Sequence, residues 1–274
     1  MAENKNDFRY AVGPSKVPWT AVGEYYNADD VKEFVKFLLP DKEGKPGYDE
    51  AFAKVSGDID SLARVASRAS KLTLGDHVVA AEAAARKTFN SKYALLTNCW
   101  TSGMEIGFKL SGVEPGDEVI MPAITFIATM SYPLSIGARI VFVDVDPETM
   151  NMDPADLERK ITPKTKLIVP VHLGGYPCDM DPIMEIANRH GIYVMEDAAH
   201  GMGGMYKGRY LGAIGHFGGF SLHEVKNITS LGEGGILLTN EDFAGKQLPQ
   251  ARFLGLDGSR QIKDWLYDIV PLRD

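Results

Sequence analysis

From residue 92 onwards, short apolar runs alternate with amphipathic segments, each about ten residues long. Runs rich in Val, Ile and Leu predict strands, and the segments between them predict helices. The expected strands are 93–96, 118–121, 139–143, 167–171, 193–195, 217–222 and 236–239, and the expected helices are 102–110, 125–136, 156–161 and 181–190. This alternation is typical of a mostly parallel sheet covered by helices on both faces. We therefore expect an α/β fold, in which the last two strands form a hairpin-like edge.

The first part of the chain has a different pattern. Residues 1–23 are irregular and rich in Pro and Gly, whereas apolar positions with helical spacing predict helices at 25–39, 49–70 and 76–90. The segment 40–47, Pro-Asp-Lys-Glu-Gly-Lys-Pro-Gly, has the composition of an exposed loop.

Composition narrows the class of protein. The chain has 274 residues, 45% of them hydrophobic, which is enough for a sizeable core. Its net charge of −8, without any basic run, argues against a nucleic-acid-binding protein. Cys99 and Cys178 are far apart in sequence, so a disulfide framework is not expected. Because there is also no signal-peptide pattern and no apolar run long enough to span a membrane, we expect a cytoplasmic protein.

Candidate chemistry gathers where the predicted strands end, which is where ligands bind in sheets of this kind. After the strand 217–222 comes a polar segment with Ser221, His223, Glu224 and Lys226. A lysine next to a core strand can be partly desolvated, which makes its neutral amine a nucleophile. The alternative reading of Lys226 is a solvated surface residue.

A carboxylate and an imidazole follow the strand 193–195, in the segment Glu196-Asp-Ala-Ala-His200. Asp197 could hold the protonated nitrogen of a heterocycle, because an opposite charge keeps that nitrogen cationic. The alternative is that Asp197 caps a helix and that His200 is only a satisfied structural residue.

Two further strand ends carry candidate binding groups. Thr101 and Ser102 are predicted at a helix start, where hydroxyls and free N–H groups can bind a phosphate, although plain helix capping would use the same residues. Phe126, at the start of the helix 125–136, could stack on a flat ring or belong to the core. Asp144 and Asp146 have no third ligand nearby, so no metal site is expected.

Together, a lysine nucleophile, a carboxylate, a phosphate cradle and an aromatic cover make a set of groups suited to pyridoxal phosphate (PLP). The chain resembles the DegT/StrS family of PLP-dependent sugar aminotransferases, which has the aspartate-aminotransferase fold. The resemblance extends over about residues 72–270 and rests on several ordered motifs. These are 196–200, 206–208, 218–227 and 232–235, with support from 122–129 and 171–181.

The resemblance implies roles for individual residues. Lys226 would form the internal aldimine with PLP and then move protons, Asp197 would pair with the pyridinium, and His200 would lie beside the ring 3-hydroxyl. Phe126 would stack on the ring, and the phosphate would be held by Thr101, Ser102 and Ser221. The implied enzyme is a homodimer with its site at the interface. It would move an amino group from glutamate or glutamine to a keto group of a nucleotide-linked sugar or a cyclitol. Lys226 separates the chain from the dehydratase branch, which has histidine in that place.

The chain departs from the family pattern in three ways. It stops near residue 271, about where relatives enter a C-terminal small domain, so we expect that domain to be absent. A helical insertion is expected at about 40–70, within an N-terminal segment 1–71 that precedes the PLP-binding domain 72–274. Cys99 and Trp100 replace the small residues usual in the phosphate loop. The first departure leaves a competing hypothesis, namely a truncated, non-catalytic protein that keeps the PLP fold.

Overall fold

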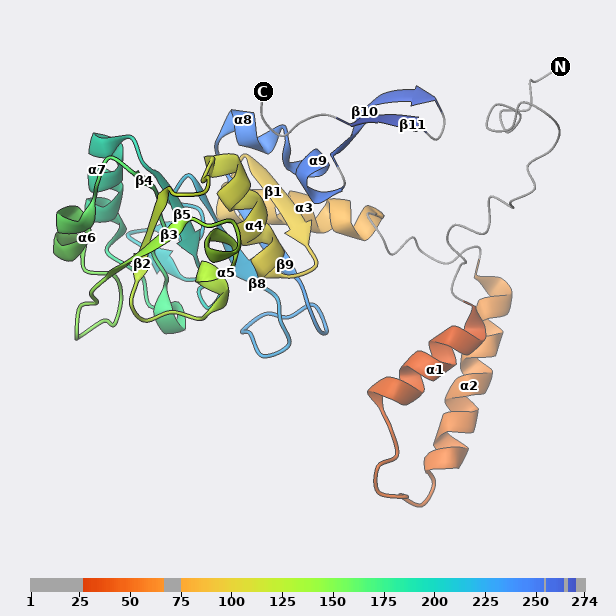
Figure 1. Ribbon diagram of the computed structural model, residues 1–274. Coiled ribbons are helices and arrows are strands. Elements are labelled where there is room, and N and C mark those ends of the chain that lie inside the picture. Colours follow the sequence, from red (N-terminus) through yellow and green to blue (C-terminus); the bar gives the residue numbers. More distant parts are fainter. Residues whose placement is uncertain (1–26, 67–74, 254, 264–265, 270–274) are drawn as a thin grey trace. The chain divides into compact units, whose positions relative to one another are not determined.

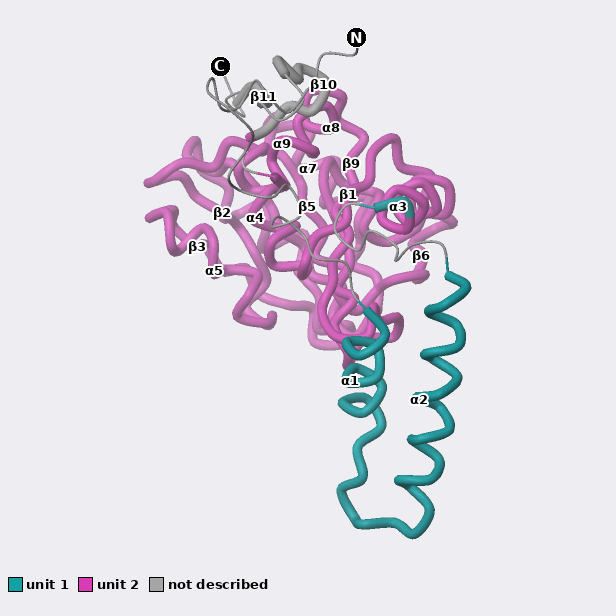
Figure 2. Tube along the Cα trace, turned by 90° about the vertical axis from the view of Figure 1, so that its right-hand side faces the viewer, with its two compact units in different colours: residues 1–76 teal, residues 77–274 magenta. Residues whose placement is uncertain are grey.

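A computed structural model describes the backbone of residues 27–66, 75–253, 255–263 and 266–269. The chain divides into two compact units, residues 1–76 and residues 77–274 (Figure 2). The irregular N-terminal stretch expected at 1–23 lies outside the described residues.

The described part of the first unit is a pair of helices. Helix α1 (Ala28–Leu38) begins at Asn27, whose side chain accepts from the backbone N–H of Asp30 while the Asp30 carboxylate accepts from the N–H of Asn27. This reciprocal capping fixes the helix start. Helix α2 (Tyr48–Val65) follows the expected loop, and Lys32 joins the two helices through an ion pair of 2.6 Å with Asp60. The helices expected at 25–39 and 49–70 are confirmed over Ala28–Leu38 and Tyr48–Val65, while 25–26 and 67–70 lie outside the described residues.

The second unit is built on a seven-stranded sheet with the order β1-β9-β8-β5-β4-β2-β3 (Figure 1). All neighbouring strands from β8 to β3 are parallel, and β9 alone runs antiparallel to its two neighbours. The sheet is therefore mixed and mostly parallel. The strands are β1 (Tyr93–Thr97), β2 (Glu118–Pro122), β3 (Arg139–Val143), β4 (Thr165–Ile168), β5 (Tyr193–Asp197), β8 (Phe217–Ser221) and β9 (Gly235–Thr239).

Two expectations about the strands were wrong. The strands β8 and β9 do not form an edge: β9 is fully buried between β8 and β1, and its residues pair with both neighbours over its whole length. Moreover, residues 222–234 connect the two strands, which is too long for a tight turn. The strand expected at 167–171 begins earlier and ends at Ile168, because Pro170 has no N–H to continue the ladder.

Helices cover both faces of the sheet, and each layer closes its own hydrophobic core. Since alternate residues of a strand face opposite sides, Val194 belongs to one core and Met195 to the other. The first core lies under α3 (Asp76–Phe89), α6 (Pro154–Lys160) and α7 (Met180–His190); the second lies under α4 (Trp100–Ser111), α5 (Ala128–Ser135), α8 (Asp242–Gly245) and α9 (Leu248–Arg252). The three-layer α/β/α sandwich predicted from the sequence is confirmed.

The remaining elements are small. A hairpin of β6 (Met205–Tyr206) and β7 (Arg209–Tyr210) follows β5, and a second antiparallel pair, β10 (Leu256–Lys263) and β11 (Leu266–Ile269), follows α9. Within the described ranges, no helix combines the length and the apolar character needed to cross a membrane.

Candidate functional site

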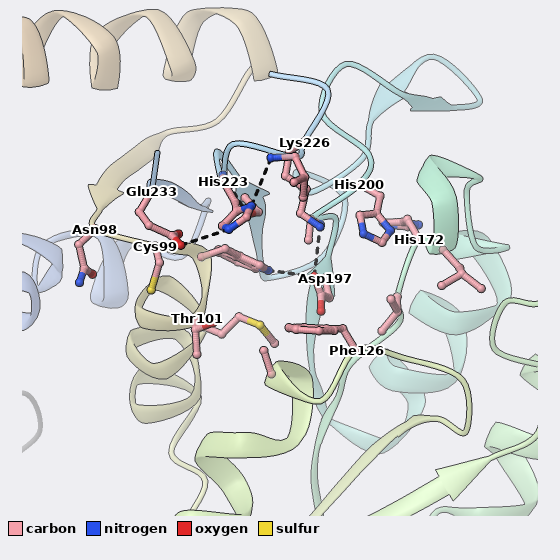
Figure 3. Close-up of a pocket in the computed structure, with 18 residues that line it drawn as sticks. Asn98, Cys99, Thr101, Phe126, His172, Asp197, His200, His223, Lys226 and Glu233 are labelled. Atoms are coloured by element: carbon pink, nitrogen blue, oxygen red, sulfur yellow. Dashed lines mark hydrogen bonds and ion pairs between the residues drawn. The ribbon is translucent and has the colours of Figure 1, made fainter. Parts of the chain in front are cut away.

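A cavity of about 660 Å³ lies at the carboxyl ends of the parallel strands (Figure 3). Asp197 ends β5 and Ser221 ends β8, and both line this cavity, as the topology of such sheets predicts. Of the seven residues to which the resemblance assigns a role, six line the cavity together: Thr101, Phe126, Asp197, His200, Ser221 and Lys226. Ser102 is the exception, since its hydroxyl lies 3.4 Å from Cys99 Sγ and does not reach the cavity wall.

Lys226 lies in the connection that follows β8. A turn holds it in place, because its backbone N–H donates to the carbonyl oxygen of His223 at 2.9 Å. The neighbouring Asn227 donates from its side chain to the carbonyl oxygen of Met202 at 2.9 Å, which fastens the connection to the loop after β5. The amine-bearing residue is therefore fixed beside the segment that carries Asp197 and His200.

Asp197 is almost fully buried and accepts three hydrogen bonds. Its Oδ1 accepts from the indole Nε1 of Trp100 at 2.9 Å and from the backbone N–H of Ala199 at 3.2 Å. Its Oδ2 accepts from the hydroxyl of Thr129 at 2.8 Å. The sequence did not indicate that Trp100 and Thr129 donate to Asp197, because both are far from it along the chain. Since a carboxylate accepts about four hydrogen bonds, one position on Oδ2 is left for a donor in the cavity.

His200 is held in one tautomer. Its Nδ1 accepts from the backbone N–H of Gly174 at 3.3 Å, so the proton of the neutral ring is on Nε2. Burial lowers the pKa of the imidazole, the charge of Lys226 lowers it further, and Asp197 opposes the shift. At neutral pH His200 is therefore an uncharged donor through Nε2.

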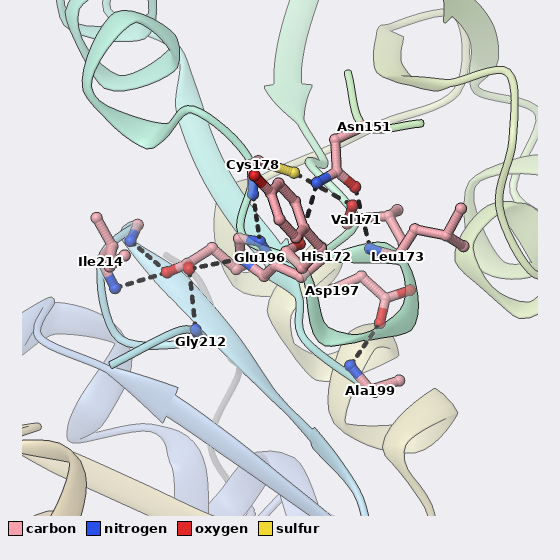
Figure 4. Close-up of polar contacts among 12 residues, drawn as sticks. Asn151, Val171, His172, Leu173, Cys178, Glu196, Asp197, Ala199, Gly212 and Ile214 are labelled. Atoms are coloured by element: carbon pink, nitrogen blue, oxygen red, sulfur yellow. Dashed lines mark hydrogen bonds and ion pairs between the residues drawn. The ribbon is translucent and has the colours of Figure 1, made fainter. Parts of the chain in front are cut away.

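Beside the cavity, a buried pair of side chains, His172 and Glu196, supports the strand ends, and His172 also lines the cavity (Figure 4). The carboxylate of Glu196 accepts from His172 Nε2 at 2.9 Å and from the backbone N–H groups of Gly212, Ile214 and Gly215. Burial lowers the pKa of His172, but its contacts with Cys178 and Glu196 outweigh this effect, so the pKa lies above its ordinary value. The backbone N–H of Cys178 donates to His172 Nδ1 at 3.0 Å, so the ring donates to Glu196 through Nε2.

The N-terminus of α4 forms another part of the wall. Cys99, the residue before α4, makes no side-chain hydrogen bond that caps the helix. The N–H groups of the first turn of α4 therefore remain available to an anion. Thr101 lines the cavity here, and Ser221 faces it from β8. Phe126 was expected at a helix start but lies two residues before α5, and 71% of its surface is exposed.

A further pair in the wall was not singled out as a site. His223 Nε2 lies 3.3 Å from a carboxylate oxygen of Glu233, and both residues line the cavity near Lys226. The two belong to opposite ends of the connection between β8 and β9, so no short motif relates them. In the described ranges, no group of three or more His, Cys, Asp or Glu side chains is arranged to hold a metal ion.

Comparison with known proteins places this geometry in a family. Residues 55–270 match the DegT/DnrJ/EryC1/StrS aminotransferase family. The GDP-perosamine synthase of Caulobacter vibrioides is 42% identical over 189 residues, which are 69% of this chain and 51% of that protein. The structure of an aminotransferase from Psychrobacter cryohalolentis superposes with a TM-score of 0.68 at 34% identity, covering 79% of this chain and 53% of that one.

The fold is shared with an enzyme of another reaction as well. The E. coli GDP-4-keto-6-deoxy-D-mannose-3-dehydratase, solved with bound hydrated PLP, superposes with a TM-score of 0.64 at 30% identity, over 67% of this chain and 49% of that one. The chain thus spans about half the length of the relatives it matches. With the family match covering well over half of its residues, this chain belongs to the DegT/DnrJ/EryC1/StrS aminotransferase family.

Proposed function

We propose that this protein is a PLP-dependent aminotransferase that transfers an amino group from glutamate or glutamine to a keto group of a nucleotide-linked sugar or a cyclitol. The observation that carries the proposal is that Lys226 and Asp197 line one cavity at the sheet edge. Family membership and the PLP-containing relative support the same cofactor.

The chemistry of the lining residues suits PLP. Lys226 has the only type of side chain that offers a primary amine to an aldehyde, and Asp197 has one free acceptor position for a ring N–H. The uncapped start of α4, together with Thr101 and Ser221, provides N–H and hydroxyl donors for a phosphate. Phe126 supplies an aromatic face for the ring.

When bound, PLP supplies an aldehyde that condenses with amines and a pyridinium ring that withdraws electrons from the neighbouring carbon. The chain would do the rest. The Lys226 amine would attach the cofactor and would then carry a proton between the nitrogen-bearing carbon of the substrate and the cofactor. Asp197 would keep the ring nitrogen protonated. His200 would donate from Nε2 to an oxygen of the cofactor, because its Nδ1 is already used by Gly174.

A dehydratase is the second candidate, since one structural relative has that activity. Lys226 favours amino transfer, because a primary amine can both bind a carbonyl covalently and shuttle its proton, whereas an imidazole cannot form such a bond. The sugar substrate is inferred from the relatives, whose names include GDP-linked sugars.

We further propose that the enzyme works as a homodimer in the cytoplasm. Phe126 and Val225 line the cavity and are 71% and 73% exposed, which suggests that a second copy covers this side of the site. Both cysteines are free thiols, as expected in a reducing compartment. Sedimentation of the purified chain at micromolar concentration would give twice the monomer mass; a monomer under these conditions would contradict the dimer.

The function can be tested in two half-reactions. The chain is incubated with PLP and glutamate labelled with ¹⁵N at the α-amino group, or with glutamine labelled at the same position, and the formation of the corresponding keto acid is measured. A GDP- or TDP-linked 4-keto-6-deoxy sugar is then added, and the product is analysed by mass spectrometry. A ¹⁵N-labelled amino sugar is expected. Deoxygenation without nitrogen transfer would indicate the dehydratase. Keto acid in no more than an equimolar amount to the chain, without any sugar product, would indicate a PLP-binding protein without turnover.

A further inference from the structure

Trp100 is the first residue of α4 and connects two parts of the cavity. Its side chain reaches away from the helix start, and its Nε1 donates to Asp197 Oδ1 at 2.9 Å. Both residues are only 5% exposed, so water does not compete freely for this bond. The next residue along the chain, Thr101, faces the cavity where a phosphate would bind.

The surroundings of Trp100 are shaped to hold the indole ring. A Cβ atom added at Gly219 in β8 would lie 2.4 Å from Trp100 Cζ3, and one added at Gly103 would lie 2.9 Å from its Cε3. Any larger residue at these two positions would therefore collide with the ring. Because the ring is confined in this way, the direction of its N–H is fixed as well.

This arrangement determines which part of Asp197 stays open. Trp100 and Ala199 together occupy Oδ1, and Thr129 takes one position on Oδ2. Without the indole N–H, Oδ1 would keep only the backbone N–H of Ala199 at 3.2 Å, and the orientation of the carboxylate would be held less firmly. With the indole N–H, a single acceptor direction remains.

We propose that Trp100 is a positioning residue that couples the phosphate-binding turn at the start of α4 to the carboxylate that holds the ring nitrogen of the cofactor. The inference rests on the proposed PLP site and deepens it. The two ends of a rigid cofactor must be bound at a fixed separation, and the indole sets that separation between the turn and Asp197.

The test is cofactor binding by Trp100→Phe, which keeps an aromatic ring and removes the N–H. We expect the Kd for PLP to rise about tenfold. The Kd for pyridoxal, which lacks the phosphate, should rise by no more than about threefold. The variant should therefore lose part of the affinity that the phosphate adds to PLP over pyridoxal. Replacing a residue that only fills space would change both constants alike. Tyr132→Phe, which removes a ring hydroxyl on α5 outside the cavity lining, is the matched control and should leave both constants unchanged.

Two measurements keep the test independent of folding and of the proposed function. If Trp100→Phe does not fold, benzothienylalanine at position 100 keeps the bicyclic ring and removes only the N–H. In an Asp197→Ala background, the effect of Trp100→Phe on PLP affinity should disappear. A Kd for PLP equal to that of the wild type would overturn the inference. A lower Kd would overturn it too, because the indole would then compete with the cofactor for Asp197. Failure of the wild type to bind PLP would instead refute the proposed function.

Discussion

Thr129 offers a sharp test of how Asp197 is held. Its side chain is fully buried, and its hydroxyl donates to Asp197 Oδ2 at 2.8 Å and lies 2.7 Å from the hydroxyl of Thr125. Thr129→Val keeps the shape of the side chain and removes one of three donors to the carboxylate. A hydrogen bond to a charged group contributes about 1.5–3 kcal/mol to the free energy of unfolding.

We therefore expect Thr129→Val to lower the free energy of unfolding by about 1.5–3 kcal/mol. For a unit of this size, that loss lowers the melting temperature by roughly 3 to 12 °C. The assay is urea and thermal unfolding of the cofactor-free chain, followed by circular dichroism. Thr125→Val is the matched control, because it removes the neighbouring hydroxyl while the bond from Thr129 to Asp197 remains.

The control should cost less than about 1 kcal/mol, since Thr125 is half-buried and water can replace its contact. A Thr129→Val variant within about 0.5 kcal/mol of the wild type, which is the usual range for surface substitutions, would show that the hydrogen bond to Asp197 does not stabilise the fold. Equal destabilisation of the two variants would show that the cost does not come from the carboxylate.

Three other predictions concern the ionisable groups. Burial, followed by the charge of Lys226, lowers the pKa of His200 below its ordinary 6.5. The unfolded chain therefore binds more protons than the folded chain, and stability falls as the pH drops below that value. His200→Asn should reduce the dependence of the melting temperature on pH between about pH 7 and pH 5, and an unchanged dependence would count against this assignment. Glu196→Gln places an amide NH2 opposite backbone N–H groups that now donate to the carboxylate. It should lower the free energy of unfolding in urea by about 3 kcal/mol, whereas a loss below about 1 kcal/mol would show that the site adapts. The backbone N–H of Asp144 and then Lys160 lower the pKa of Asp156 from 3.8 to about 2. The carboxylate therefore stabilises the fold fully above pH 3.8, and this contribution is lost as the pH falls through about 2. Asp156→Asn should lose less free energy of unfolding in this acid range than the wild type, and an equal loss would contradict the prediction.

Much of the fold could be predicted from the sequence, because local patterns decide it. The apolar runs and the amphipathic segments between them located the strands and helices. The helix expected at 156–161 begins two residues earlier, at Pro154, because the side chain of Asp153 caps it. The position of β9 could not be obtained in this way. Whether a buried strand lies inside a sheet or at its edge depends on pairing with β1, which is about 140 residues away in sequence and leaves no local signal.

The sequence predicted which strand ends form the candidate site, but not which side chains contact one another there. Topology brings strand ends to one edge, which is why Asp197, Ser221 and Lys226 meet. The donors to Asp197 could not be predicted, because Trp100 and Thr129 reach it from two other elements through side-chain packing. Ser102 was expected to face the cavity, but α4 begins at Trp100 and turns this side chain towards Cys99. The roles of these residues towards a cofactor stay predictions.

If Lys226 holds the cofactor, PLP must attach covalently to this lysine. The full chain is incubated with PLP, reduced with borohydride, digested and mapped by mass spectrometry. Lys226→Ala is treated in the same way. The control is Lys207→Ala, which removes an amine that pairs with Asp181 on the surface. We expect a visible absorption band in the wild type and in Lys207→Ala, with the reduced adduct on Lys226. In Lys226→Ala we expect neither band nor adduct. A folded wild type without the band, or an adduct on another lysine, would contradict the proposed role of Lys226.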